Sequence, residues 1–502
     1  MSGRLPALPA GPPAAVTLAV VLLLGACAVG PSYRPEAPVP AASRVGGGGP
    51  DTTTRRFFDS LATARAADSA ASDTATVLPL RLPADSGVGA AWLDLFRDST
   101  LVRLVETAVR QNREVQAAVA RIREFRALVG VARSPLFPTV TVNGSASTNQ
   151  SVFGSFPPSR FDAIRVTGDL AWELDFWGRI RRGLQAARAD LSAQEASQRA
   201  VLLTLVSDVA SGYLQLLQLD EERTISARTL ASRQEVLKLA QRRFDQGVIS
   251  ELDVRQFEAQ VAVAASALAV AERDRAQREH QLSVLLAEAP TAVPRGGSLV
   301  QAVSALTVPD SIPATLVARR PDVQEAERNY AAATARIGAA QAARLPTFSV
   351  SGSYGTQATG TSNLFDSSRE VYQLQGAISV PIFTGGFLSS QAGAARARAE
   401  QARAQYEQTV LVALGESSDA LVGVRTARDI TAAQQTQAQA LRRALELAQR
   451  RYVSGVASYV EVLDAQRSLF DAELSLSRAR LEELQAAVEL YRSIGGSWTR
   501  AR

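Results

Sequence analysis

Side chains that do covalent or acid–base chemistry are scarce in this sequence of 502 residues, which has one cysteine, Cys27, and one histidine, His280. A lone histidine without cysteine partners cannot build a zinc site, and no nucleophile pattern surrounds it. The sequence also lacks the motifs GxxxxGK[ST], GxSxG and HExxH. Its cations are almost all arginines interspersed with acids, so the net charge of +5 forms no basic stripe for nucleic acid. We therefore expect no enzyme activity, no metal site and no nucleic-acid partner.

The sequence before Cys27 indicates a role for this cysteine. Arg4 is followed by an apolar run at 16–24, which is too short to span a membrane but fits a secretory signal. The run ends in LGAC, which resembles the bacterial lipobox, and Ala28 in place of aspartate resembles an outer-membrane lipoprotein. We predict a signal peptide over 1–26 and a covalent lipid on Cys27, with no other cofactor. A retained signal anchor is the alternative interpretation.

Most of the remaining chain consists of two copies of one unit. Residues 239–254 (LAQRRFDQGVISELDV) and 447–462 (LAQRRYVSGVASYVEV) match in register, 208 positions apart. Pro138 and Pro346 head a second matching pair of segments at the same offset. Two matches at one spacing indicate a duplication. The predicted parts are the signal peptide, an extended linker over 27–91, repeat 1 over 92–297, a linker over 298–309, repeat 2 over 310–496 and a tail over 497–502.

Each repeat contains two stretches in which apolar and polar residues alternate with a period of two. The predicted strands are 138–149 and 164–176 in repeat 1, and 346–357 and 371–384 in repeat 2. Their length, an apolar face and a wet opposite face are typical of transmembrane β-strands, although a soluble sandwich also alternates. Unpaired strand edges are costly in lipid, and four strands cannot close a barrel. The chain is therefore expected to oligomerise.

Long alanine-rich stretches predict paired antiparallel helices. We expect a helix over 321–344 and helical hairpins over 179–287 and 386–494, each with its turn at 219–224 or 425–429. Gly247 and Gly455 then interrupt the returning helices. The two copies of the duplicated stretch are expected side by side in an equatorial belt, with Phe244 and Tyr452 packed inward. The predicted fold class is membrane α+β, with four strands and coiled-coil helices per chain.

Taken together, the features described above resemble those of the TolC family of bacterial outer-membrane efflux proteins, in the lipoprotein branch typified by OprM. The resembling segments are CAVGPSYRPEAPVP from Cys27, WLDLF at 92–96, both Pro-led strand pairs, FWGR at 176–179, PIFTGG at 381–386, and the duplicated stretch, whose second copy continues as LDAQRSL. The segment 41–89 is longer than the family pattern. The resemblance implies a homotrimer with a twelve-stranded barrel and an α-helical periplasmic tunnel in the outer membrane of a Gram-negative-type bacterium.

Gate residues are carried over from the same resemblance. The family narrows its periplasmic mouth with acidic and apolar side chains, which implies Asp419, then Glu416, with Leu414 and Leu421 as apolar neighbours. Asp419 and Glu416 lie one helical turn apart and thus on one face. Arg425 and Arg428 are expected to form ion pairs or adaptor contacts at the tip. Solvated acids on a coil surface are the alternative.

The function implied is that of an exit duct. It would passively conduct drugs or other small toxic compounds from a periplasmic adaptor and an inner-membrane pump, of the RND type, to the exterior. An outer-membrane channel for type I protein secretion uses the same tube and is one alternative. A coiled-coil surface lipoprotein is another, but it does not account for four alternating strands.

Overall fold

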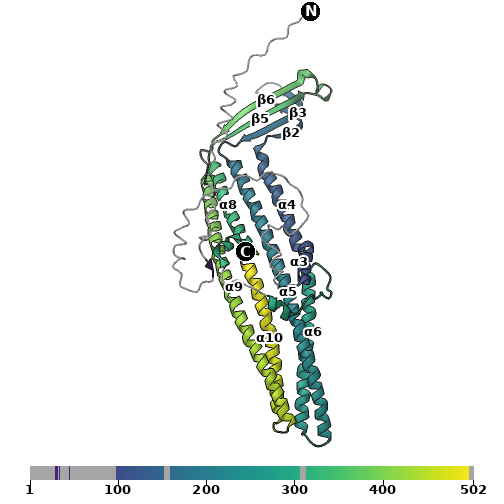
Figure 1. Ribbon diagram of the computed structural model, residues 1–502. Helices are drawn as coiled ribbons and strands as arrows, with labels where there is room; N and C mark the ends of the chain where they lie inside the picture. Colours follow the sequence, from purple (N-terminus) through teal and green to yellow (C-terminus); the bar gives the residue numbers. More distant parts are fainter. Residues whose placement is uncertain are drawn as a thin grey trace, which may run out of the picture. The chain divides into compact units, whose positions relative to one another are not determined.

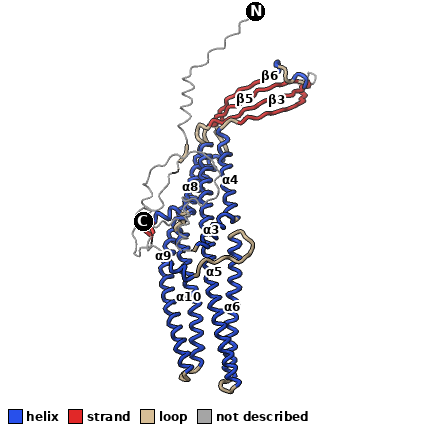
Figure 2. The backbone as a smooth tube through the Cα atoms, turned by 45° about the vertical axis from the view of Figure 1, so that its right-hand side comes forward, coloured by secondary structure: helices blue, strands red, loops and turns tan. Residues whose placement is uncertain are grey.

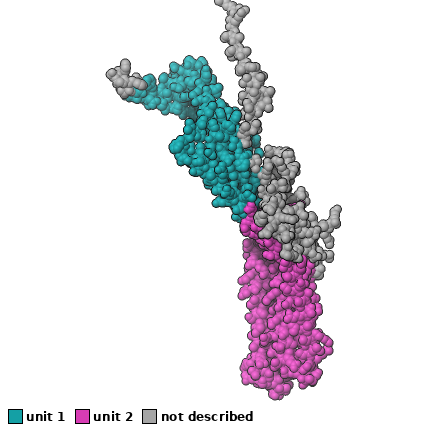
Figure 3. All heavy atoms as spheres, turned by 90° about the vertical axis from the view of Figure 1, so that its left-hand side faces the viewer, with its two compact units in different colours: residues 1–35, 122–193, 326–406 teal, residues 36–121, 194–325, 407–502 magenta. Residues whose placement is uncertain are grey.

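A computed structural model describes residues 29–31, 33, 44–45, 96, 98–151, 159–305 and 312–496. The predicted signal peptide, Cys27, most of the 27–91 linker and the tail 497–502 lie outside these residues. The chain divides into two compact units, each built from separate segments and coloured in Figure 3. Unit 1 comprises residues 1–35, 122–193 and 326–406, and unit 2 comprises residues 36–121, 194–325 and 407–502.

Unit 1 contains a four-stranded antiparallel sheet in the order β2-β3-β5-β6 (Figure 1). The strands are β2 (Thr139–Ser151), β3 (Ser159–Leu174), β5 (Thr347–Ala358) and β6 (Glu370–Ser379). The central pair β3–β5 joins the two repeats, with Trp172 opposite Val350. The prediction that the last strand continues to residue 384 is wrong, because Pro381 has no backbone N–H to donate to a ladder.

The long helices begin directly after the returning strands. In repeat 1 the Asp175 carboxylate accepts hydrogen bonds from the backbone N–H groups of Ile180 (3.0 Å) and Arg181 (2.8 Å), which caps the first turn. Gly178 turns the chain there with a φ of 82°, and Gly386 does the same in repeat 2 with a φ of 85°. The duplicated sequence therefore sets the same exit from the sheet in both repeats.

Helices make up most of the remainder of both units (Figure 2). They are α3 (Ser99–Gln111), α4 (Arg113–Arg133), α5 (Arg179–Asp245), α6 (Glu251–Leu285), α7 (Leu299–Ala305), α8 (Pro321–Ala342), α9 (Phe387–Val453) and α10 (Tyr459–Ser493). Corresponding helices have equal lengths: α5 and α9 have 67 residues each, and α6 and α10 have 35 each. Short elements are η2 (Ser134–Leu136), η3 (Ala314–Arg319), η4 (Thr361–Asn363), η5 (Ser367–Arg369), and the paired strands β1 (Arg44–Val45) and β4 (Ile312–Pro313).

The main apolar core lies in unit 2, where α3 packs on α5, α6 and α10. Tyr213 of α5 is fully buried in it, and its hydroxyl donates a 2.6 Å hydrogen bond to Asp98. Asp98 in turn accepts from the N–H of Thr100 (2.8 Å) as the N-cap of α3. An apolar window of α5 is long enough to cross a membrane, but 67% of it is buried, as expected for a core helix.

The hairpin turns are not where the sequence predicted them. Residues 219–224 and 425–429 are helical, because they contain neither glycine nor proline and nothing there ends the hydrogen-bond ladder. The turns lie instead at Gly247 and Gly455, whose φ angles are 73° and 70°. The next amides, of Val248 and Val456, donate back five residues to Arg243 O (2.8 Å) and Arg451 O (3.0 Å), which closes both helices.

Equivalent residues make the same anchoring contact within each repeat. Asn112, between α3 and α4, donates its side-chain amide to the carbonyl of Leu285 (3.0 Å). Arg320, just before α8, donates its guanidinium to the carbonyl of Ser493 (2.9 Å). Both donors and both acceptors are 208 positions apart in the sequence. The start of the second helix in each repeat is thus anchored to the last turn of its hairpin.

We expect Ala287→Gly to stabilise the protein. Ala287 has a φ of 58°, whereas its counterpart in repeat 2 is Gly495, with a φ of 77°. A left-handed conformation costs a residue with a Cβ about 1 kcal/mol, so the glycine should gain up to that amount. Thermal melting of the purified protein in detergent checks this.

The matched control is Ala265→Gly in the exposed middle of α6, which should lower stability by about 1 kcal/mol. Equal destabilisation by both substitutions would contradict the strain at Ala287.

Candidate functional site

The ends of the two hairpins meet in unit 2. Arg243 at the end of α5 donates a hydrogen bond to the Tyr452 hydroxyl and lies over its ring, 5.5 Å from the centroid. Tyr459 of α10 contacts Tyr452 edge-on (5.2 Å between centroids) and Phe257 of α6 (4.4 Å). Burial raises the pKa of Tyr459 to about 12. The prediction that the two copies are neighbours is confirmed, but they lie at the hairpin ends and not in a belt, and Phe244 is exposed rather than packed inward.

Apolar side chains project from both hairpin ends. Val248 and Leu252 in the first hairpin are 65% and 66% exposed, and Val453 in the second is 84% exposed. Val456 and Val460 are exposed as well. Apolar side chains grouped on a surface mark interaction sites more often than single ones do. The hairpin ends therefore have the chemistry of a contact surface, held in shape by the aromatic cluster behind them.

The residues predicted for the gate are not beside a turn. Glu416 accepts a 2.6 Å hydrogen bond from Arg320, whose guanidinium is buried and also pairs with Asp322 (2.8 Å). Leu421 is buried and Leu414 is half-buried, whereas Asp419 is exposed on α9. The sequence predicted a turn at 425–429, just after these residues. In the structure they lie within the unbroken helix α9.

The two predicted tip arginines are also on this helix and not at its end. Arg428 lies 4.0 Å from Glu483 of α10, within the second hairpin. Arg425 is exposed on α9. Both lie more than twenty positions before the turn at Gly455. The prediction that they occupy the tip is therefore wrong.

A buried acid joins the two hairpins, and sequence reasoning missed it. Glu473 of α10 accepts from Arg228 of α5 and from Arg442 of α9 (2.7 Å), although its side chain is only 9% exposed. Glu221 of α5 pairs with Arg480 of α10 at 2.8 Å. A polar cavity of about 270 Å³ lies among these charges. No local signal marks Glu473, because its arginine partners lie 245 and 31 positions away in the sequence.

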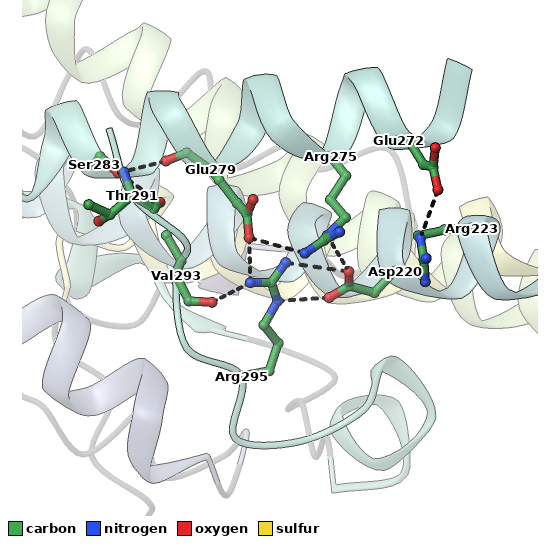
Figure 4. A network of polar contacts seen from close by, with 9 residues as sticks. All are labelled: Asp220, Arg223, Glu272, Arg275, Glu279, Ser283, Thr291, Val293 and Arg295. Carbon is green, nitrogen blue, oxygen red and sulfur yellow. Dashed lines mark hydrogen bonds and ion pairs between the residues drawn. The ribbon is translucent and has the colours of Figure 1, made fainter. Parts of the chain in front are cut away.

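A second charged network holds the segment that closes repeat 1 (Figure 4). Arg295 donates to Asp220 of α5 (2.8 Å), to Glu279 of α6 and to the carbonyl of Val293. Arg275 also pairs with Asp220, at 3.0 Å. Asp220 had been expected in a turn, but its carboxylate serves as an anchor for residues 55 and 75 positions away.

Residues shortly after Cys27 are fixed to the helices of unit 1. Gly30 approaches Gly338 of α8 so closely that a Cβ on Gly30 would lie 2.3 Å from its Cα. Arg182 donates to the Gly30 carbonyl (3.0 Å), and the Tyr33 hydroxyl donates to Glu327 (3.0 Å). Burial, followed by the nearby Glu327 charge, raises the pKa of Tyr33. We call the described residues 29–31 and 33 the strap.

Comparison with known proteins identifies the family. The model for outer membrane efflux proteins matches residues 104–288 and 312–496, one match in each repeat. The chain is 33% identical to the solvent efflux pump outer membrane protein SrpC of Pseudomonas putida, over 95% of this chain and 97% of SrpC. It is 32% identical to the antibiotic efflux pump outer membrane protein ArpC of Pseudomonas putida, over 96% of this chain and 95% of ArpC.

Solved structures agree with these relatives. CusC superimposes with a TM-score of 0.79 at 26% identity, covering 94% of this chain and all of that one. The outer-membrane channel OprN superimposes with a TM-score of 0.77 at 29% identity and the same coverage. Four antiparallel strands combined with long paired helices confirm the predicted fold class. The chain belongs to the outer membrane efflux protein family, with the TolC-type fold and a place in the outer membrane of Gram-negative bacteria.

Proposed function

We propose that three copies of this chain form a passive exit channel of a tripartite efflux system. The observation that carries this proposal is the open sheet. β2 and β6 are its edges within the described chain, and each would leave a row of backbone donors and acceptors unpaired. In lipid such groups cost several kcal/mol each, so pairing β6 of one copy with β2 of the next is strongly favoured. Three copies supply twelve strands, enough for a closed barrel around an aqueous lumen.

The side chains of β6 support a membrane location for the sheet. Tyr372, Leu374 and Ile378 are all highly exposed and share one face of the strand, because residues two apart point the same way. Exposed apolar residues on one face suit contact with lipid acyl chains, while Gln373 and Gln375 on the other face suit water. A coiled-coil surface lipoprotein would need no such strands. The efflux named in the relatives favours small compounds over secreted proteins as cargo.

The apolar hairpin ends are the proposed contact with a periplasmic adaptor protein. That adaptor would connect the channel to an inner-membrane pump, of the RND type, which supplies the energy. The exposed valines and Leu252 supply apolar area, and the positive-φ glycines at both turns let the backbone approach a partner closely. The strap would lead from a lipid on Cys27, which we propose as a second attachment to the membrane.

Opening of the channel would separate the two hairpins at their charged contacts. Glu473 is shared between Arg228 of the first hairpin and Arg442 of the second, so it links them only while they are together. Removing one member of a buried pair leaves the other groups poorly paired. Asp419, exposed on α9, is proposed for the wall of the conduit, where carboxylates favour cations. Glu416 is proposed as a structural partner of Arg320.

Reconstitution tests the channel itself. The full-length protein, purified from outer membranes, should migrate as a heat-modifiable trimer and conduct ions in planar bilayers, because only a closed barrel satisfies the strand edges in lipid. Asp419→Ala should reduce its preference for cations. Monomers that insert without conductance would refute the proposed function.

Glu473→Gln should favour the open state. Losing the charge weakens the link between hairpins by about 1 kcal/mol, which corresponds to about a fivefold higher open probability in single-channel recordings. The matched control is Glu489→Gln, which removes the same charge from an exposed pair with Arg492 on the same helix. An equal response to both substitutions, or none to either, would exclude Glu473 as the link.

Mass spectrometry tests the lipid. The mature protein should begin at Cys27 and carry acyl chains, and Cys27→Ala should lose them because the acceptor thiol is gone. Ala28→Asp keeps the thiol and should keep the lipid. An unmodified Cys27 in wild-type protein would show that the signal is a retained anchor or is cleaved by another route.

A further inference from the structure

A recess in unit 1 has a cationic border and a small-residue floor. It has a volume of about 460 Å³ and is formed by α4, η2, α5, α8 and α9. One arginine from each of three helices borders it: Arg179 from α5, Arg336 from α8 and Arg398 from α9. Among the described residues that line it, none is acidic. Arginines from three separate helices thus border one recess, which a single charged helix face would not provide.

Small side chains keep the recess hollow. Its floor includes Gly183 of α5, together with Ala339 and Ala340 of α8. A Cβ added to Gly183 would meet no atom within 4 Å, so this position opens onto free space. The floor is apolar because alanine and glycine present only methyl and methylene groups. The recess therefore combines apolar surface with hydrogen-bond donors at its edge.

Two of the three arginines are oriented by acids outside the recess. Glu173 accepts from Nε and Nη2 of Arg179 at 3.2 and 2.8 Å, which fixes the guanidinium plane. Asp190 accepts from Nη2 of Arg336. Arg398 is exposed and forms no ion pair with any described residue. The recess thus carries one uncompensated positive charge, and the two oriented guanidinium groups retain further N–H donors.

The recess lies on the face of α8 opposite to the strap. Gly338 and Tyr330 face the strap. Arg336 and Ala340 each lie about half a helical turn around from Gly338, since each residue advances about 100°. If the strap follows a lipid anchor on the outside of the tube, the recess faces its interior.

We propose that this recess binds the charged end of an anionic amphiphile, meaning a carboxylate, sulfonate or phosphate ester on a small apolar body. Guanidinium groups recognise such oxyanions through paired, charge-assisted hydrogen bonds. The methyl-lined floor receives the apolar body, as ligand sites generally combine apolar walls with a few fixed polar groups. That this ligand would lie inside a conduit rests on the proposed function. Its binding to the recess does not depend on that function.

Binding is measured on the full-length protein in phosphatidylcholine nanodiscs by calorimetry. The probes are 1-naphthalenesulfonate and its uncharged analogue 1-naphthalenemethanol, which share the apolar body. The sulfonate should bind more tightly, and Arg398→Gln should weaken it about tenfold, the value of one charge-assisted hydrogen bond. Arg396→Gln is the matched control, because it removes the same charge two positions away from outside the recess.

A second variant changes the shape and leaves the charge. Gly183→Leu places its Cβ where no atom lies within 4 Å and extends its side chain into the recess, so it should fold normally and abolish sulfonate binding. Equal binding of the uncharged probe, equal weakening by Arg396→Gln and Arg398→Gln, or unchanged binding in Gly183→Leu would each overturn the proposal.

Two further measurements are needed. One distinguishes a lipid from a dissolved solute as the ligand, and the other distinguishes a failure of the proposed recess from a failure of the proposed channel. If phosphatidylglycerol nanodiscs suppress sulfonate binding, a lipid headgroup is the occupant. If sulfonate binding is unchanged in them, the occupant is a dissolved solute. Both results support an anion site. Conductance is recorded on the same proteins. A conducting channel that fails to bind the sulfonate counts against the recess alone, whereas binding without conductance counts against the proposed channel.

Discussion

Satisfying the backbone hydrogen bonds of four strands is the constraint on which this structure depends. Within a chain, β3 and β5 are paired on both sides, but β2 and β6 are paired on only one. Water could complete the pairing of a soluble sheet, whereas lipid cannot. In the proposed channel, a membrane location and assembly with further copies are therefore two aspects of one requirement. The long helices follow because the strand exits at Gly178 and Gly386 direct the chain into them.

The duplication shows that different side chains meet one structural demand. At the anchor between helix start and hairpin end, repeat 1 uses the neutral Asn112 and repeat 2 uses the charged Arg320. The arginine then needs acids, and Glu416 and Asp322 supply them. The acid at 416 thus has a structural role as a partner of Arg320.

The sequence was informative where the signal is local. A period of two, flanked by Pro138 and Gly178, predicted the strands, and the repeated stretch predicted two equivalent hairpins. It failed at the turns because Asp220 and Glu221 have the polarity of a turn, while their actual partners, Arg295 and Arg480, are distant in the sequence. Gly247 was recognised as a helix end but was read as a break, since nothing local distinguishes a kink from a reversal. Glu473 and the recess depend on helices meeting in space, which no spacing rule reports.

The equal lengths of the paired helices have an evolutionary consequence. α5 has the same number of residues as α9, and α6 has the same number as α10, although most of their side chains differ. Inserting or deleting one residue would rotate every later side chain by about 100° and misalign Glu473 and the hairpin ends together. Descendants of the duplicated gene could thus exchange amino acids freely but hardly change their number within the helices. Variation in length is expected in segments such as 359–369 between β5 and β6, where no later contact is displaced.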